Sequence, residues 1–227
     1  MEKTIKSKVA IIGYGHIGQI IAENLIRNNR PVIIAGRDFS KAKMLAEKLG
    51  SAARPMEIGA AIQEADIVVL AVWFDAIKEL FYEYESLLKG KIIVDPSNPI
   101  APDGKGGFAK KIGKNESAGQ LHAQLLPDAA KLAKALGTLS AASLAGAANQ
   151  KPEPAVLFYA TDDTTINGEI ETLIRDMGFE PLRIGGIEQS IRLEVFGDLH
   201  EFGGLGKTVS LPEARKKLEA GVSSPAL

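Results

Sequence analysis

The chain has 227 residues and a formal net charge of −1, so its charge gives no basis for binding nucleic acid or an anionic membrane. It contains no cysteine, which excludes disulfides, thiolate metal sites, iron–sulfur clusters and a cysteine nucleophile. Because 45% of its residues are hydrophobic, it can bury a core as one large domain or one domain with a small appendage. The apolar run Val9–Ile12 is too short for a signal peptide or a membrane span, and we expect a cytoplasmic protein.

The first predicted strand, Val9–Ile12, leads directly into a loop of pattern G-x-G-x-x-G, and a helical pattern follows over residues 17–28. A strand before and a helix after are the context that a dinucleotide-binding loop requires. The glycines permit a tight turn, close approach of a pyrophosphate and packing of the helix on the strand, while the helix N-terminus offers N–H groups to phosphates. A purely structural turn is the alternative. The predicted binding residues are Gly13, Tyr14, Gly15, His16, Ile17 and Gly18.

The end of the second predicted strand, Pro31–Ala35, indicates which dinucleotide is bound. An NAD site carries an acid here, for the ribose 2′-hydroxyl, whereas this chain has Gly36 and Arg37. Gly36 leaves room, Arg37 can form two charge-assisted bonds with a 2′-phosphate, and Lys41 adds a second positive charge. Asp38 is interpreted as a helix-capping or turn residue. These residues favour NADP over NAD, although a solvated arginine in a polar turn is the simpler reading.

Strands and helices alternate along the rest of the chain. We expect helices at 40–49, 57–64, 75–88, 117–126, 140–148 and 163–177, with a further helical pattern from residue 188. We expect extended segments at 52–55, 67–72, 91–94, 132–136, 155–160 and 181–184, and a loop over 95–107 that is too rich in proline and glycine for helix or strand. The alternation predicts an α/β fold with a Rossmann doubly wound parallel sheet. We assign residues 1–141 to an NADP-binding domain and 142–227 to a small C-terminal α/β extension that completes the acceptor site.

Ligands of such sheets bind beyond the carboxyl ends of the strands, which directs attention to the loops 72–75 and 95–100. The strand end at 71–73 is where we expect the nicotinamide half. Trp73, the only tryptophan, either stacks on the cofactor, shields it from water or merely packs. Asn98 either bonds the ribose or carboxamide or, with Pro99, forms a routine turn. The candidate cofactor-binding residues of these loops are Ala71, Val72, Trp73, Asn98 and Pro99.

Nothing in the sequence specifies a catalytic or metal-binding side chain. The three histidines have no metal spacing, and His122 reads as a satisfied residue on a helix face rather than a base. A basic loop over residues 105–114 is either solvated charge or an attractor of an anionic second substrate.

The ordered set of motifs resembles the NADP-dependent oxidoreductases that act on the deazaflavin coenzyme F420, and the related NADPH-binding domain of STEAP-type metalloreductases. The resemblance covers nearly the whole chain. It rests on the segments 13–18, 36–41, 92–99, 135–141, 156–184 and 202–206. It implies hydride transfer between C4 of nicotinamide and C5 of the deazaflavin, with the protein mainly positioning two rings.

One segment departs from the family. The deazaflavin reductases carry a histidine in the stretch matching 135–141, where it helps to hold the second coenzyme, and the metalloreductase-like relatives carry an asparagine. This chain has Gly137 followed by Thr138. F420, a flavin and a small quinone therefore stay open as acceptors. We expect the acceptor between loops 73–75 and 98–100 and segment 137–141, with Thr138 and Ser140 as its polar groups.

Two functional hypotheses follow. The first is an NADPH-dependent oxidoreductase with a small-molecule acceptor, and the second is a non-catalytic NADP-binding redox sensor. We also expect a homodimer. About thirty residues follow Val195 and Phe196, too few for the helical dimerisation domain of pyrroline-carboxylate and imine reductases.

Overall fold

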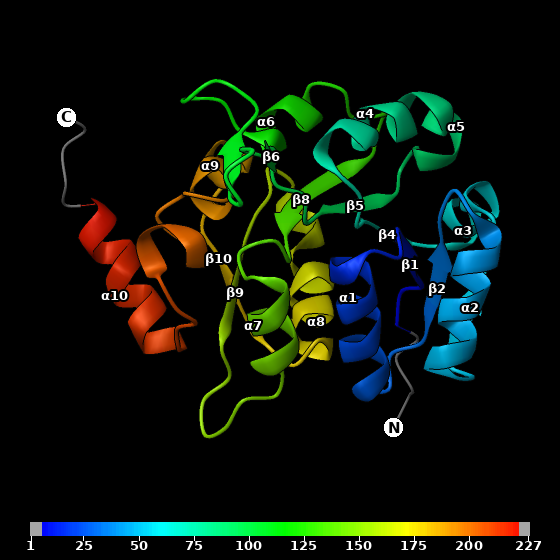
Figure 1. The fold of residues 1–227 in the computed structure, drawn as a ribbon, viewed down its shortest axis with the longest axis horizontal. Coiled ribbons are helices and arrows are strands. Elements are labelled where there is room, and N and C mark those ends of the chain that lie inside the picture. The colour runs from blue at the N-terminus through cyan, green and yellow to red at the C-terminus, as the bar shows by residue number, and fades with distance from the viewer. Residues whose placement is uncertain (1–5, 223–227) are drawn as a thin grey trace.

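The computed structural model describes residues 6–222, which contain an eight-stranded sheet with the strand order β10-β9-β8-β5-β4-β1-β2-β3 (Figure 1). Six neighbouring strands of this sheet run parallel to one another: β8, β5, β4, β1, β2 and β3. Their order is that of the Rossmann fold, in which the strand order reverses between β1 and β4. The fold class is therefore as predicted. The strands of this sheet are β1 (Val9–Ile12), β2 (Val32–Ala35), β3 (Ala53–Pro55), β4 (Ile67–Leu70), β5 (Ile92–Asp95), β8 (Lys131–Ala135), β9 (Val156–Ala160) and β10 (Glu180–Arg183).

Helices cover both faces of the sheet because its central strands are apolar on both sides. In β1, Val9 and Ile11 join the core under one layer of helices, whereas Ala10 and Ile12 join the core under the other. The first layer consists of α1 (His16–Arg27), α2 (Phe39–Leu49), α7 (Ala141–Gly146) and α8 (Asn167–Asp176). The second consists of α3 (Ile58–Glu64), α4 (Phe74–Glu83), α5 (Glu85–Leu88) and α6 (Ala118–Ala123).

The C-terminal part extends the same sheet instead of forming a separate one. A third core packs Leu193, Leu199 and Val209 against Val156 and Phe158 of β9. Its elements are α9 (Ser190–Leu193) and α10 (Leu211–Val222), and the short turns in this half are η1 (Thr164–Ile166), η2 (Ile187–Gln189) and η3 (Glu201–Leu205). The predicted boundary at residue 141 coincides with the start of α7, and the division into two domains stays a prediction.

The last two strands depart from the predicted parallel sheet. β9 pairs antiparallel with β8, through Lys134 opposite Ala160 and Ala135 opposite Tyr159. β10 is parallel to β9, so both run against the other six strands. The alternation of strand and helix is the same whichever way the chain returns to the sheet edge, so the pattern alone does not determine this direction.

The segment 95–107, predicted to lack regular structure, contains a strand. β6 (Ile100–Pro102) pairs antiparallel with β7 (Phe108–Lys110) in a small hairpin. Gly104 and Gly106 adopt positive φ values of 73° and 90° in its turn, and the Asp103 carboxylate accepts the N–H groups of Lys105 and Gly107. The glycines taken as a sign of irregular structure therefore close a turn.

Other departures concern element ends. The predicted helix 75–88 is divided at Tyr84 into α4 and α5, and the predicted strand 67–72 ends at Leu70. The predicted helix 163–177 begins with the turn η1 before α8. No helix within residues 6–222 is long and apolar enough to cross a membrane. Residues 1–5 of the charged N-terminus lie outside the described part of the chain.

Candidate functional site

Two glycines of the loop between β1 and α1 are required by packing. Gly13 has a φ of 117°, and a Cβ atom on it would lie 2.2 Å from the carbonyl oxygen of Ala71. A Cβ atom on Gly18 would lie 2.1 Å from the carbonyl oxygen of Gly13. The roles predicted for these glycines, a tight turn and close packing of helix on strand, are both confirmed.

Gly15 differs from Gly13 and Gly18 because no atom of residues 6–222 fills the space beside it. A Cβ atom on Gly15 would meet no atom within 4 Å, and its φ of −70° suits any residue. Gly15 is the N-cap of α1, has no side-chain cap bond, and no acidic residue follows in the first turn. Side chains cap α2, α6 and α7, whereas α3, α4 and α8 have no side-chain cap bond, like α1. The uncapped end of a 12-residue helix, with open space beside a glycine, fits a pyrophosphate.

Tyr14 occupies the space above Gly36 that the sequence assigned to a 2′-phosphate. A Cβ atom on Gly36 would lie 2.3 Å from Cε1 of Tyr14, so the missing side chain makes room for this ring. The Tyr14 hydroxyl accepts the backbone N–H of Asp38 at 3.1 Å. The expectation that Gly36 leaves room for the 2′-phosphate is therefore wrong, because the Tyr14 ring takes that room.

Arg37 and Lys41 stand at the surface beside this contact. Asp38 caps α2 as predicted, since its carboxylate accepts the backbone N–H of Lys41 at 3.3 Å and lies 3.7 Å from the Lys41 ammonium. Arg37 is exposed, and within residues 6–222 its side chain has no hydrogen-bonding or ionic partner. Both cations are therefore accessible to an anion at the end of β2.

The segment after β4 lies under and beside the glycine loop. Ala71 contributes the carbonyl and Cβ atoms that restrict positions 13 and 18, and Val72 is half-buried next to them. Trp73 is 65% exposed at the N-cap of α4, so core packing does not account for this side chain.

Asn98 joins three segments. Its Nδ2 donates to the carbonyl of Gly137 at 3.1 Å, and its Oδ1 accepts the backbone N–H of Val195 at 2.7 Å. Pro99, beside it, is buried. Position 137 has no room for the family's histidine without a backbone shift, because a Cβ atom there would lie 2.4 Å from the carbonyl oxygen of Pro96.

Thr138 and Ser140 are held by Glu201, a residue that the sequence did not single out. The Thr138 carbonyl accepts the Glu201 backbone N–H at 3.0 Å, and the Ser140 backbone N–H donates to the Glu201 carboxylate at 2.7 Å. Burial would raise the pKa of Glu201, but bonds from Ser143 and Ser140 bring it below its usual value. The Thr138 hydroxyl is buried and has no hydrogen-bond partner within the described residues. The structure therefore brings residues 98, 137, 138 and 140 together with the segment 195–201, which the sequence did not identify as part of the site.

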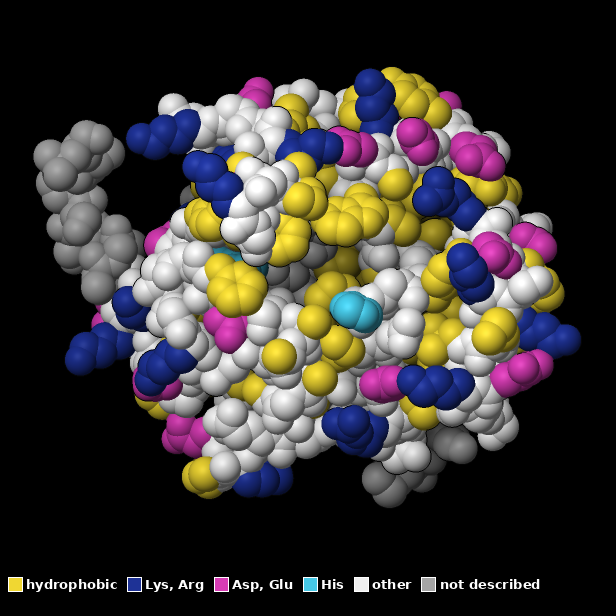
Figure 2. Space-filling model, viewed as in Figure 1, with side chains coloured by type: hydrophobic (Ala, Val, Ile, Leu, Met, Phe, Trp, Pro, Cys, Tyr) yellow, Lys and Arg dark blue, Asp and Glu magenta, His cyan; other side chains and the backbone are white. Residues whose placement is uncertain are grey.

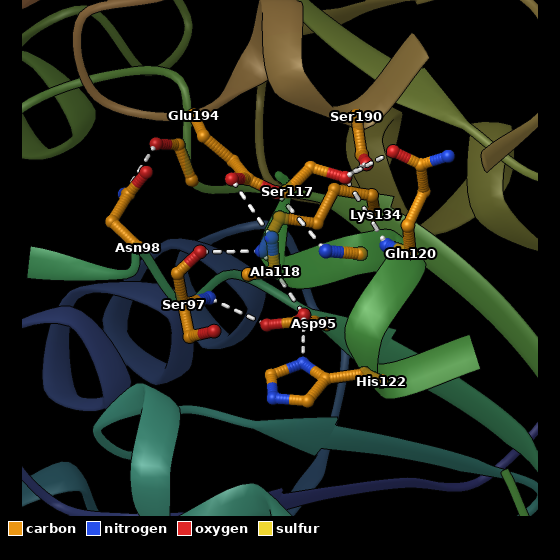
Figure 3. A network of polar contacts seen from close by, with 12 residues as sticks. Asp95, Ser97, Asn98, Ser117, Ala118, Gln120, His122, Lys134, Ser190 and Glu194 are labelled. Carbon is orange, nitrogen blue, oxygen red and sulfur yellow. Dashed lines mark hydrogen bonds and ion pairs between the residues drawn. The ribbon is translucent and has the colours of Figure 1, made fainter. Parts of the chain in front are cut away.

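A buried charged network underlies these loops and was also missed (Figure 3). Asp95, at the end of β5, is fully buried, with Oδ2 3.0 Å from the Lys134 ammonium and 2.8 Å from Nδ1 of His122. Its other oxygen accepts the backbone N–H of Ser97 at 2.7 Å. Burial would raise the pKa of Asp95, but Lys134 and His122 hold it well below its usual range. His122 is the satisfied helix residue that the sequence indicated.

Glu194, the residue after α9, continues the network. Its carboxylate accepts the backbone N–H groups of Ala118 and Gly119 at 3.0 Å each, and so caps α6 (Figure 3). Burial raises the pKa of Glu194, against the opposing effects of Lys134 and the two N–H groups. The signal for this network was a charged residue, Lys134, inside an apolar strand, because a buried charge requires a partner.

The surface is hollowed at the carboxyl ends of the parallel strands. Figure 2 shows a hollow near the middle of this face, beside the N-terminal end of α1 as placed in Figure 1, with hydrophobic side chains on its walls. A groove of about 300 Å³ also runs between α1 and α7, and His16 and Ala141 are among its lining residues. Of the basic loop, Lys111 pairs with Asp75, and Lys110 donates to the carbonyl of Glu116. Within residues 6–222, no group of three or more histidine or acidic side chains could hold a metal ion.

Comparisons with known proteins agree with this geometry. Residues 8–99 match the family described as NADP oxidoreductase, coenzyme F420-dependent, which confirms the resemblance for that part of the chain. A structure of the hypothetical protein SMa0349 from Sinorhizobium meliloti superposes with a TM-score of 0.79 and 27% identity, over 92% of this chain and 97% of that one. A candidate F420-dependent NADP reductase from Arthrobacter sp. FB24 shares the fold with a TM-score of 0.70 and 22% identity, over 81% and 87% of the two chains.

Curated relatives share only part of their length with this chain. A glutamyl-tRNA reductase of Methanococcus aeolicus is 30% identical over 106 residues, which are 43% of this chain and 27% of that enzyme. The chain thus spans about a quarter of the length of this relative. The structural neighbours share the fold of this chain, and the family model matched by residues 8–99 is one of NADP oxidoreductases.

Proposed function

Because residues 8–99 match the F420-dependent NADP oxidoreductases, we propose that this chain transfers a hydride between NADP(H) and a deazaflavin or flavin-like ring. The observation that carries the proposal is the open backbone at Gly15, at the uncapped N-terminus of α1, beside the accessible cations Arg37 and Lys41. An anionic dinucleotide with a 2′-phosphate matches both features.

Different residues of the site would bind different parts of the cofactor. The backbone of the loop 13–18 and the first turn of α1 would hold the pyrophosphate. Arg37 and Lys41 would bind the 2′-phosphate, since no acid stands at position 36 and the Asp38 carboxylate already accepts the Lys41 N–H. Bound NADPH would supply the hydride, and the chain's own task is to bind, orient and exclude water.

The acceptor region follows from what the structure leaves exposed. Trp73 is mostly exposed, and Phe196 and Phe202 on the C-terminal segment are 54% and 61% exposed. Asn98 and Glu201 tie that segment to residues 137–140. Exposed aromatic rings beside these hydrogen-bonded loops suit a planar apolar acceptor, which supports a deazaflavin or flavin-like substrate.

The test is oxidation of NADPH by a panel of acceptors, namely F420, FMN, riboflavin and a small quinone, followed by stopped-flow absorbance. We expect turnover with at least one ring acceptor. Trp73→Ala should lower kcat by about two- to tenfold, and by more than it lowers NADPH affinity, because one well-packed aromatic contact contributes roughly 0.5–1.5 kcal/mol beyond its buried area.

Two variants control this experiment. Trp73→Phe keeps a ring and should retain most of the activity. Tyr82→Ala removes an aromatic ring that is also 65% exposed but lies on the last turn of α4, and it should leave turnover unchanged. NADPH binding without oxidation of any acceptor would support the redox-sensor function instead.

A further inference from the structure

Tyr14 belongs to the glycine loop but makes its side-chain contacts with the loop after β2. Its ring covers Gly36, where a Cβ atom would lie 2.3 Å from Cε1 and 2.7 Å from Cδ1. Its hydroxyl accepts the backbone N–H of Asp38 at 3.1 Å. The residue between these two contact points is Arg37.

The far side of the same loop is fixed by α2. The Asp38 carboxylate accepts the Lys41 backbone N–H at 3.3 Å, and the Asp38 carbonyl accepts the Ala42 N–H at 3.2 Å. On the near side, the Asp38 N–H has the Tyr14 hydroxyl as its partner. Tyr14 therefore supplies the contact that holds the start of this turn against the glycine loop.

We infer that Tyr14 is a positioning residue for cofactor discrimination, holding residues 36–38 so that Arg37 meets the 2′-phosphate of a dinucleotide bound at the glycine loop. This rests on the proposed binding of NADP(H). A backbone held on both sides of Arg37 limits the positions of its guanidinium, and less conformational freedom is lost when it binds a phosphate. NADH has no 2′-phosphate, so its affinity does not depend on this positioning.

The geometry also explains why an acid cannot simply be introduced at the end of β2. Any side chain at position 36 would collide with the Tyr14 ring. Gly36 and Tyr14 therefore form a matched pair: the glycine admits the ring, and the ring occupies the place where an NAD-type acid would begin.

The test compares NADPH and NADH affinity, by calorimetry, in the wild type and Tyr14→Phe. This variant keeps the ring over Gly36 and loses only the acceptor for the Asp38 N–H. We expect NADPH affinity to fall about two- to tenfold, the usual worth of one hydrogen bond, and NADH affinity to change by less than twofold. Equal loss for both cofactors would show a general structural role and overturn the inference.

A double-mutant cycle with Arg37→Ala tests the route of the effect. If Tyr14 acts through Arg37, Tyr14→Phe should cause no further loss of NADPH affinity in the Arg37→Ala background. Additive losses would overturn the inference. Tyr159→Phe serves as a matched control, since its hydroxyl bonds Glu171 at 3.0 Å and touches neither loop, and it should leave the NADPH-to-NADH ratio unchanged.

The outcomes separate this inference from the function on which it rests. If the wild type binds neither dinucleotide, the proposed function itself is contradicted. If the wild type prefers NADPH and Tyr14→Phe keeps that full preference, only the role of Tyr14 is contradicted. A second substitution, Gly36→Ala, should reduce the preference for NADPH by displacing the ring. Tyr14→Ser combined with Gly36→Ala relieves the collision, so a folding defect of Gly36→Ala alone would be recognised by its rescue in the pair.

Discussion

The glycines between β1 and α1 differ in whether the fold itself requires them. Gly13 and Gly18 face backbone oxygens at 2.2 and 2.1 Å from where a Cβ atom would lie, so the fold itself needs them. Gly15 has an ordinary φ of −70° and open space, so the fold does not need a glycine there. The absence of a side chain at Gly15 leaves open space at the N-terminus of α1, which suits a phosphate group.

Gly15→Val should therefore abolish NADPH binding and leave the protein folded, because the branched side chain would occupy the place of the pyrophosphate. At an NADPH concentration of 100 times Kd, binding adds about 2.7 kcal/mol to the free energy of unfolding of the wild type. The variant should gain nothing from NADPH in the same denaturant titration.

Gly18→Val is the contrasting control, since it should destabilise the protein even without cofactor. If Gly15→Val keeps the full gain in stability from NADPH, this loop does not hold the pyrophosphate.

Some residue roles could be predicted from sequence because they depend on near neighbours. The glycine pattern and the capping of α2 by Asp38 are examples. The contact of Tyr14 with Gly36 could not be predicted, because it joins residues 22 positions apart through the parallel pairing of β1 and β2. The same holds for Gly137, whose lack of space depends on the backbone of Pro96 in the neighbouring strand end.

At the scale of elements, the ends of β5 and β8 are joined by buried charges. Asp95 and Lys134 come from neighbouring strands, His122 comes from α6, and Glu194 directly follows α9. Because the four residues lie far apart in the sequence, no local sequence pattern predicts the network. It fixes the strand ends from which Asn98 and Thr138 extend, so its function is to position the candidate site.

His200 predicts a pH dependence of stability. It is 2% exposed, its Nδ1 accepts the Phe202 N–H at 2.9 Å, and burial lowers its pKa from 6.5 to about 4. Between pH 6.5 and 4 the unfolded chain binds a proton that the folded chain does not, so the stability due to this group is lost as pH falls through that range. From pH 7.5 to 5 the loss should be about 2 kcal/mol.

Urea titrations at pH 7.5 and pH 5, on the wild type and on His200→Gln, measure this effect. The variant cannot titrate at this position and should lose about 2 kcal/mol less than the wild type over the interval. Other titrating groups are common to both proteins and cancel in the comparison. Identical pH dependence in the two proteins would mean that His200 is not held neutral in the folded state.

At the scale of the whole molecule, the alternation of strands and helices was sufficient to predict the Rossmann sheet. It could not reveal that β9 and β10 run against the other strands, or that glycines 104 and 106 close a hairpin. It also could not show that residues 195–201 return to the carboxyl edge of the sheet, where they contact Asn98, Thr138 and Ser140. This return supports the prediction that the C-terminal region completes the acceptor site.

The central claim is that the fold presents a site for NADP(H) at this edge. Its most direct test is calorimetric titration of NADPH and of NADH into the wild type and Arg37→Ala, with Arg175→Ala in the last turn of α8 as a matched loss of one cation. A charge-assisted bond contributes roughly 1.5–3 kcal/mol. We predict that the wild type prefers NADPH, that Arg37→Ala weakens NADPH by about tenfold to a hundredfold while NADH changes little, and that Arg175→Ala changes neither. Equal affinities of the wild type for NADPH and NADH, or equal losses of both in Arg37→Ala, would contradict the account.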